Sequence, residues 1–265
     1  MARPGKRDGL ARILRSAAVL LILSASAGTV RAQSSAGRPA PAVGAYADFF
    51  ELARPGSLTA TAFGGGFTSA EYATTQEGFQ LEQSITPNIA LAGRVTGYQL
   101  FVEKGFDNPL APGNEQHARY NFGRLQAGLN LEPYPNTHFV ILGGGDVGDS
   151  NAAVIEGGLS TWLWVYSPHP INFAFDSAHD FQNGVTSSEI DLRTVVFSRE
   201  RYMVTAGGAG EIYGGGFLSG LSGQGGPSLA AYLRHWNAGV ELTGGYGTAR
   251  AFVQLNVFKQ LGWSE

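Results

Sequence analysis

The stretch RAFVQLNVFKQ, residues 250–260, alternates apolar and polar side chains along most of its length. Its apolar positions are Ala251, Val253, Leu255 and Val257. Its polar positions include Arg250, Gln254 and Asn256. Because successive side chains of a β-strand point to opposite faces, the stretch predicts a strand with one apolar and one polar face.

The same alternation recurs earlier in the chain. In FQLEQSIT, residues 79–86, Phe79, Leu81 and Ile85 share one face, although Gln83 interrupts it. The stretches RLQAGLNLE (124–132) and EIDLRTV (189–195) alternate in the same way. A repeated two-residue period of this kind indicates an all-β protein rather than a helical one.

Short connections separate several of these strands. In TWLWVYSPHPINFAF, residues 161–175, only Ser167 to Pro170 lie between two runs of aromatic and β-branched residues. Similar short connections occur at Pro87-Asn88, 133–136 and 198–201. Proline cannot continue a strand ladder and Asn tolerates turn geometry, so these segments predict hairpin turns. His169 is therefore interpreted as a solvated turn residue without a catalytic partner.

Eleven candidate strands follow from this pattern, and a bacterial single-chain membrane barrel needs an even number. The candidates are 57–67, 77–86, 89–101, 118–132, 137–146, 152–166, 170–178, 187–198, 201–213, 229–243 and 248–262. We expect twelve strands, with the extra one inside the glycine-rich segment 201–222; ten is the alternative. The segment 45–53 is a further candidate, as a strand or as a short helix.

The first 32 residues have the features of a secretory signal peptide. Basic residues from Arg3 to Arg15 precede the apolar run AAVLLILSASAG, and small residues lead to Ala32. The apolar run is shorter than the ~20 residues that a membrane-spanning helix needs. We predict cleavage after Ala32, followed by a periplasmic linker at 33–56 that is rich in proline and small residues.

Composition narrows the function classes. The chain of 265 residues contains 38 Gly, 15% charged residues and no Cys, whereas an average protein has about 7% Gly and about 25% charged residues. Without residues 1–32 it keeps 12 basic and 20 acidic residues, a net charge of −8. This charge argues against nucleic acid as a partner.

The predicted strands match the ~9–11 residues that a tilted transmembrane strand needs. A closed barrel pairs every backbone group, which hydrocarbon requires. With its signal peptide, two-residue period, short turns and aromatic-rich last strand, the chain resembles the bacterial outer-membrane β-barrel proteins over about residues 57–263.

The resemblance implies a closed antiparallel transmembrane β-barrel at 57–265 in the cell outer membrane. Its expected partners are outer-membrane lipid and the outer-membrane insertion machinery. Members usually end on an aromatic residue, whereas here Ser264 and Glu265 follow Trp263. The implied function is a structural barrel, or a passive pore for small solutes or an exported polymer, with no cofactor, no metal and no enzymatic activity.

In such a barrel the polar face lines the lumen. The residues predicted to face the lumen are Gln80, Glu82, Arg94, Arg124, Gln126, Glu156, Glu189, Asp191, Arg193, Glu241, Arg250 and Gln254. Two interpretations remain open: the charges pair across a narrow lumen, or they line a narrow aqueous path. Aromatic residues near strand ends predict interfacial girdles: Trp162, Trp164, Tyr166, Trp236, Phe258 and Trp263.

Two other classes are considered. Asp176-Ser177-Ala178-His179-Asp180 supplies the residue types of an outer-membrane lipid-modifying hydrolase, but on a strand Ser177 and His179 point away from both aspartates. A soluble secreted β-sandwich would bury the apolar faces instead of exposing them to lipid. The glycine triplets 64–66, 143–145 and 214–216 lack a phosphate-loop pattern and are interpreted as sites of strand bending.

Overall fold

The computed structural model describes residues 58–69, 72–102, 118–134, 136–182, 184–215, 222–233, 236–247 and 250–263. The predicted signal peptide (1–32), the linker (33–56) and the segment 45–53 lie outside the described residues. In the part of the chain that is described, no helix is long and apolar enough to cross a membrane.

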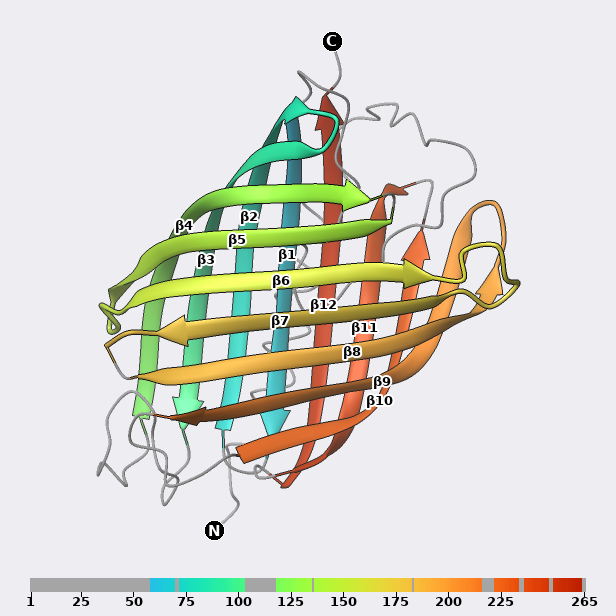
Figure 1. Ribbon diagram of the computed structural model, residues 1–265. Coiled ribbons are helices and arrows are strands. Elements are labelled where there is room, and N and C mark those ends of the chain that lie inside the picture. The colour runs from blue at the N-terminus through green and yellow to red at the C-terminus, as the bar shows by residue number, and fades with distance from the viewer. Residues whose placement is uncertain are drawn as a thin grey trace.

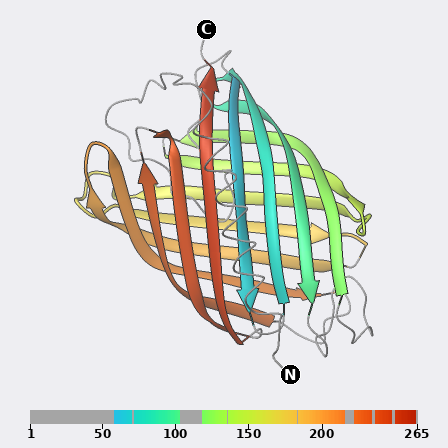
Figure 2. The same cartoon turned by 180° about the vertical axis from the view of Figure 1, so that it is seen from behind.

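Twelve antiparallel strands form one closed barrel, which confirms the predicted fold class and strand number (Figure 1). The strands are β1 (Leu58–Ser69), β2 (Tyr72–Thr86), β3 (Ile89–Val102), β4 (Ala118–Tyr134), β5 (Thr137–Gly148), β6 (Ala153–Leu163), β7 (Ile171–Asp180), β8 (Val185–Ser198), β9 (Tyr202–Gly215), β10 (Ser222–Leu233), β11 (Ala238–Gly247) and β12 (Arg250–Trp263). β1 pairs with both β2 and β12 (Figure 2), so the sheet has no free edge.

The position predicted for the twelfth strand is wrong. The segment 201–222 does not contain two strands, because β9 covers most of it and β10 begins only at Ser222. The chain folds back within 229–243, which was predicted as one strand but contains the end of β10 and the start of β11. Asn237 has a positive φ of 47° just before β11, a conformation that Asn tolerates better than most residues.

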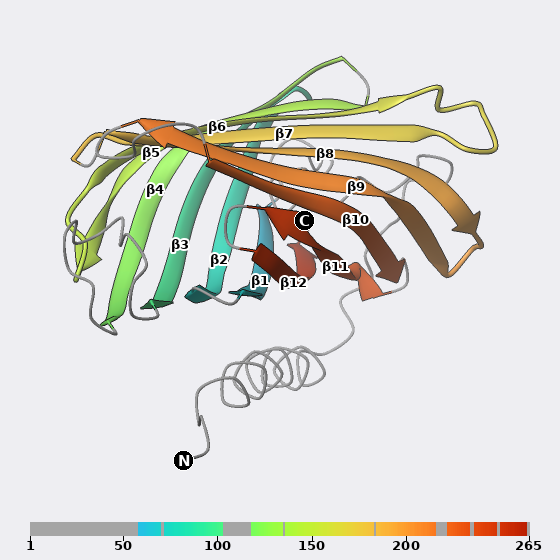
Figure 3. The ribbon, with the colours of Figure 1, turned by 90° about the horizontal axis from the view of Figure 1, so that it is seen from below.

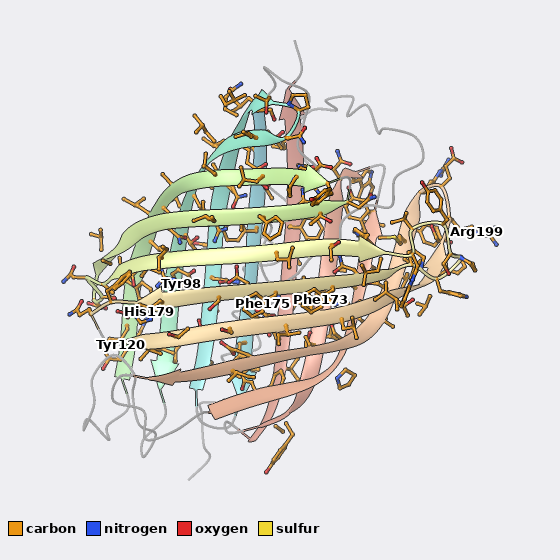
Figure 4. The ribbon with its side chains drawn as sticks, in the orientation of Figure 1. Tyr98, Tyr120, Phe173, Phe175, His179 and Arg199 are labelled. Atoms are coloured by element: carbon orange, nitrogen blue, oxygen red, sulfur yellow. The ribbon has the colours of Figure 1, made fainter. Side chains whose placement is uncertain are left out.

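The two ends of the barrel differ in their connections. The turn end carries 87–88, 135–136, 164–170, 199–201 and 234–237, together with the start of β1 and the end of β12. The loop end carries the other six connections, of which 103–117 is the longest. In Figure 4, Arg199 lies at the turn end, whereas Tyr120 and His179 lie near the loop end.

The barrel is flattened, and the strands of its two walls cross (Figures 1 and 3). β4 starts in the same wall as β3 and bends toward the wall of β5 and β6. Glycine permits a close approach at this bend: a Cβ added at Gly144 of β5 would overlap the carbonyl oxygen of Leu125 on β4. The second predicted triplet, 143–145, therefore lies where β4 and β5 approach closely.

Side chains alternate between an apolar outer face and a polar inner face. On β2, Phe79 and Leu81 are 60% and 51% exposed, whereas Gln80 and Glu82 are 1% and 5% exposed. Exposed apolar side chains continue around the barrel, for example Leu91, Leu125, Ile141 and Leu192. The soluble β-sandwich alternative is therefore wrong, because the sheet is closed and its apolar face points outward.

Candidate functional site

The inner face of the barrel contains the charged side chains that the sequence singled out. Eight of the predicted residues are buried: Gln80, Glu82, Arg94, Gln126, Glu156, Asp191, Arg193 and Glu241. Arg124, Glu189 and Gln254 are half-buried. Arg250 is the first residue of β12, and its side chain is not among those described.

A first group, the balanced cluster, consists of Gln80, Glu82, Arg94, Gln126, Asn130 and Glu156. Arg94 on β3 reaches over β4 and β5 to β6, where its Nη1 lies 2.7 Å from Glu156 Oε1. Its Nε donates to Gln80 Oε1 at 2.9 Å. Because the two partners of this ion pair lie three strands apart, the cluster braces one side of the lumen.

Amides complete the hydrogen bonding of the carboxylates in this cluster. Gln126 Nε2 donates to Glu156 Oε2 at 3.0 Å. Glu82 Oε1 accepts from Gln80 Nε2 at 2.7 Å and from Asn130 Nδ2 at 3.0 Å. Buried charges need such partners, because each loses its hydration when it leaves water.

Nearer the loop end, Arg124 forms a two-pronged ion pair. Its Nε and Nη2 donate to the Asp146 carboxylate at 2.7 and 3.1 Å, and Ser150 Oγ donates to the same carboxylate at 3.0 Å. The guanidinium lies over the ring of Tyr98, 5.3 Å from its centroid. The planar fork of Arg suits this geometry, and two parallel bonds fix its orientation.

On the opposite side, Arg193 is the centre of a second brace. From β8 it contacts Asp191 Oδ2 at 2.8 Å and also binds Glu241 on β11. The side chains of all three are almost completely buried. Like Arg94, Arg193 therefore connects strands that are three positions apart in the barrel wall.

Beside this brace lies a row of acids, the acidic arc: Asp176, Glu189 and Glu211. Asp176 on β7 is the direct cross-strand partner of Glu189 on β8, and Glu189 is the direct partner of Glu211 on β9. Gln224 on β10 extends the row and donates from Nε2 to Glu211 Oε2 at 2.8 Å. Like charges directly opposite each other destabilise a sheet.

Three further acids on the inner face were not predicted from the sequence: Asp146, Asp176 and Glu211. Asp146 and Glu211 follow glycine-rich runs, and glycine has no side chain to mark a face. Asp176 was considered only as a member of a possible triad. Counting every second residue from Asn172, through Ala174, would have placed Asp176 on the polar face.

Some of the inner face is apolar, which corrects the predicted aromatic girdle. Trp162 and Phe258 are buried: Trp162 packs with Val195 and Met203, and Phe258 packs with Phe63. Both occupy inward positions of the alternation, so they fill the lumen instead of anchoring the barrel in lipid. Trp164, Tyr166 and Trp236 are exposed at the turn end.

The residues of the possible hydrolase motif have structural contacts. Ser177 Oγ lies 2.9 Å from Ser188 Oγ. His179 Nδ1 lies 2.9 Å from Thr186 Oγ1, and its ring packs edge-on against Phe181. His169 donates from Nδ1 to the carbonyl oxygen of Val195 at 2.8 Å, as an exposed turn residue. Within the described ranges, no group of three or more His, Cys, Asp and Glu side chains could hold a metal ion.

Comparison with known proteins identifies the fold but no family. No family model and no curated protein matches the sequence. An outer membrane channel from Pseudomonas putida F1 matches with a TM-score of 0.53 and 8% identity, over 82% of this chain and 99% of that one. The chain has the fold of a bacterial outer-membrane β-barrel.

Two further solved structures match less well. The β domain of a Bordetella autotransporter matches with a TM-score of 0.47 and 9% identity, over 79% of this chain and 100% of that one. LpxR from Salmonella typhimurium matches with a TM-score of 0.46 and 8% identity, over 77% and 99%. At these identities the chemistry of the lumen has to be read from this chain's own residues.

Proposed function

We propose that this barrel is a narrow channel through which small hydrophilic solutes cross the outer membrane. The apolar outer face fits lipid, and the charged inner face fits an aqueous lumen. The two braces, Arg94 with Glu156 and Arg193 with Glu241, narrow the lumen from opposite sides. Such narrowing suits small solutes better than folded proteins.

The acidic arc is the observation that carries this proposal. The three carboxylates of the arc are direct cross-strand partners and repel one another. The buried ion pairs beside them add little stability compared with apolar packing. A barrel that served only as a scaffold would be more stable with apolar or neutral residues in these positions. Water in a lumen hydrates and screens the carboxylates, which makes the arrangement tolerable.

The orientation follows from the unequal ends. Outer-membrane barrels carry short turns on the periplasmic side and longer loops outside. We therefore place the turn end in the periplasm and the loop end, with the connection 103–117, at the cell surface. The proposed partners are outer-membrane lipid and the outer-membrane insertion machinery. We propose that the insertion machinery binds the last strand, β12, which ends at Trp263.

We also propose that the chain is not an enzyme. The hydroxyl of Ser177 bonds to Ser188, and the ring of His179 bonds to Thr186. A triad would instead need the imidazole to contact the serine and a carboxylate to orient it. Unchanged lipid profiles in cells that overproduce the barrel would agree with this; deacylated or transferred lipid would contradict it.

Single-channel conductance in planar bilayers tests the channel. The protein is first shown to be folded by a gel mobility that shifts on boiling. We expect discrete small steps for the wild type and larger steps for Arg94→Ala/Glu156→Ala, which removes both charges of one brace. Leu91→Ala, on the outer face of the same strand as Arg94, serves as the control and keeps wild-type steps. A folded barrel that stays silent in both forms contradicts the channel.

A further inference from the structure

The two sides of the lumen carry different charge. In the balanced cluster and the neighbouring Arg124 pair, two guanidinium groups face Glu82, Asp146 and Glu156. On the side of β7 to β11, the described inner face carries Asp176, Glu189, Asp191, Glu211 and Glu241 around the single guanidinium of Arg193. The excess of negative charge is therefore concentrated on one wall.

We propose that the lumen conducts small cations in preference to anions, and that the acidic arc is the segment that selects them. This inference rests on the proposed channel and names the class of solute. Carboxylates along a low-dielectric wall focus the field, concentrate counter-ions and repel anions. The positive charge of Arg193 does not cancel this effect, because its guanidinium is already bound to Asp191 and Glu241.

The arc offers oxygens that the described protein groups do not occupy. Glu189 forms no hydrogen bond or ion pair with any residue in the described ranges, and the charges that act on it are the carboxylates of Asp176, Asp191, Glu211 and Glu241. Next to it, Asp191 is 2% exposed, and its buried Oδ1 has no hydrogen-bond partner. A carboxylate in these surroundings favours a cation as its partner.

Two members of the arc are also more exposed than the brace beside them. Glu189 and Glu211 remain half-buried on the inner face, whereas Arg193 and Glu241 are 1% exposed. The neighbouring inner-face positions are small, because Gly207 and Ala209 are the direct partners of Arg193 and Asp191. A small hydrated cation therefore finds both unoccupied carboxylate oxygens and short side chains at this level of the lumen.

Reversal potentials in a KCl gradient test this inference. We expect the reversal potential of the wild type to indicate a preference for cations. In Glu189→Gln the reversal potential should lie closer to zero, and in Glu189→Gln/Glu211→Gln closer still. Both variants remove repulsion between neighbours, so folding should be preserved or improved. Glu77→Gln makes the same chemical change at an exposed position of β2 that faces outward, and should keep the wild-type potential.

The outcomes separate the two proposals. A folded barrel without conductance contradicts the channel and, with it, the selectivity. A conducting barrel that is unselective or prefers chloride leaves the channel standing and overturns the inference. A cation preference that survives both substitutions in the arc also overturns it, because the selecting charges would then lie elsewhere.

Discussion

Some buried charges in this barrel are held by partners from distant strands. Arg193 is the clearest case, because it binds Asp191 on its own strand and Glu241 on β11. Removing one member of a buried ion pair leaves an uncompensated charge, whereas removing the whole group leaves none. The contribution of the second brace to stability therefore has to be measured with matched sets of substitutions.

We predict that Arg193→Met destabilises the barrel by about 3–5 kcal/mol, because two buried carboxylates lose their cation. The combined variant Arg193→Met/Asp191→Asn/Glu241→Gln should recover most of this loss. Urea unfolding of the barrel in lipid vesicles, followed by tryptophan fluorescence, measures both. If Arg193→Met unfolded at the same urea concentration as the wild type, the brace would not contribute to the stability of the barrel.

The faces of individual residues were predictable where the strand alternates cleanly. In the segments 79–86 and 189–195, the two-residue period correctly assigns Leu81 and Leu192 to the exposed outer face. It assigns Glu82 and Asp191 to the buried inner face. The pairing of Arg94 with Glu156 was not predictable, because it depends on which strands face each other across the lumen. The inward positions of Trp162 and Phe258 were also missed, since an aromatic residue near a strand end fits a girdle equally well.

At the level of elements, the pattern predicted four of the five connections at the turn end and missed the one between β10 and β11. Pro87 and Pro168 interrupt their strands visibly. The β10–β11 connection lies in the sequence RHWN, residues 234–237, between Leu233 and Ala238. Apolar residues on both sides continued the strand pattern through it, and Asn237 with its positive φ was the single local signal.

The close approach of β4 and β5 requires glycine at position 144 but not at position 143. A Cβ at Gly144 would overlap backbone atoms of Leu125 and Gln126, whereas a Cβ at Gly143 has no atom within 4 Å. We predict that Gly144→Ala costs about 1–3 kcal/mol, as overpacking does, and that Gly143→Ala is neutral or stabilising by up to about 1 kcal/mol. The temperature at which the folded gel band disappears ranks the two; the opposite ranking would contradict a backbone contact at Gly144.

The whole molecule has both termini of its barrel at the turn end, because the number of strands is even. This arrangement agrees with the prediction that a signal peptide ending at Ala32 exports the chain, which would then fold into the outer membrane from the periplasm. Closure and the apolar outer face establish the fold, and neither depends on the identity of a solute. Orientation in the membrane is a separate property, which the unequal connections predict.

Single cysteines can test that orientation, since the chain has none of its own. Gln182 lies exposed in the β7–β8 connection at the loop end, and Ser167 lies exposed in the β6–β7 connection at the turn end. We predict that a membrane-impermeant maleimide labels Gln182→Cys on intact cells and labels Ser167→Cys only after the outer membrane is broken. Both variants should label equally in detergent, which controls for reactivity. The reverse pattern on intact cells would place the short turns outside and invert the channel.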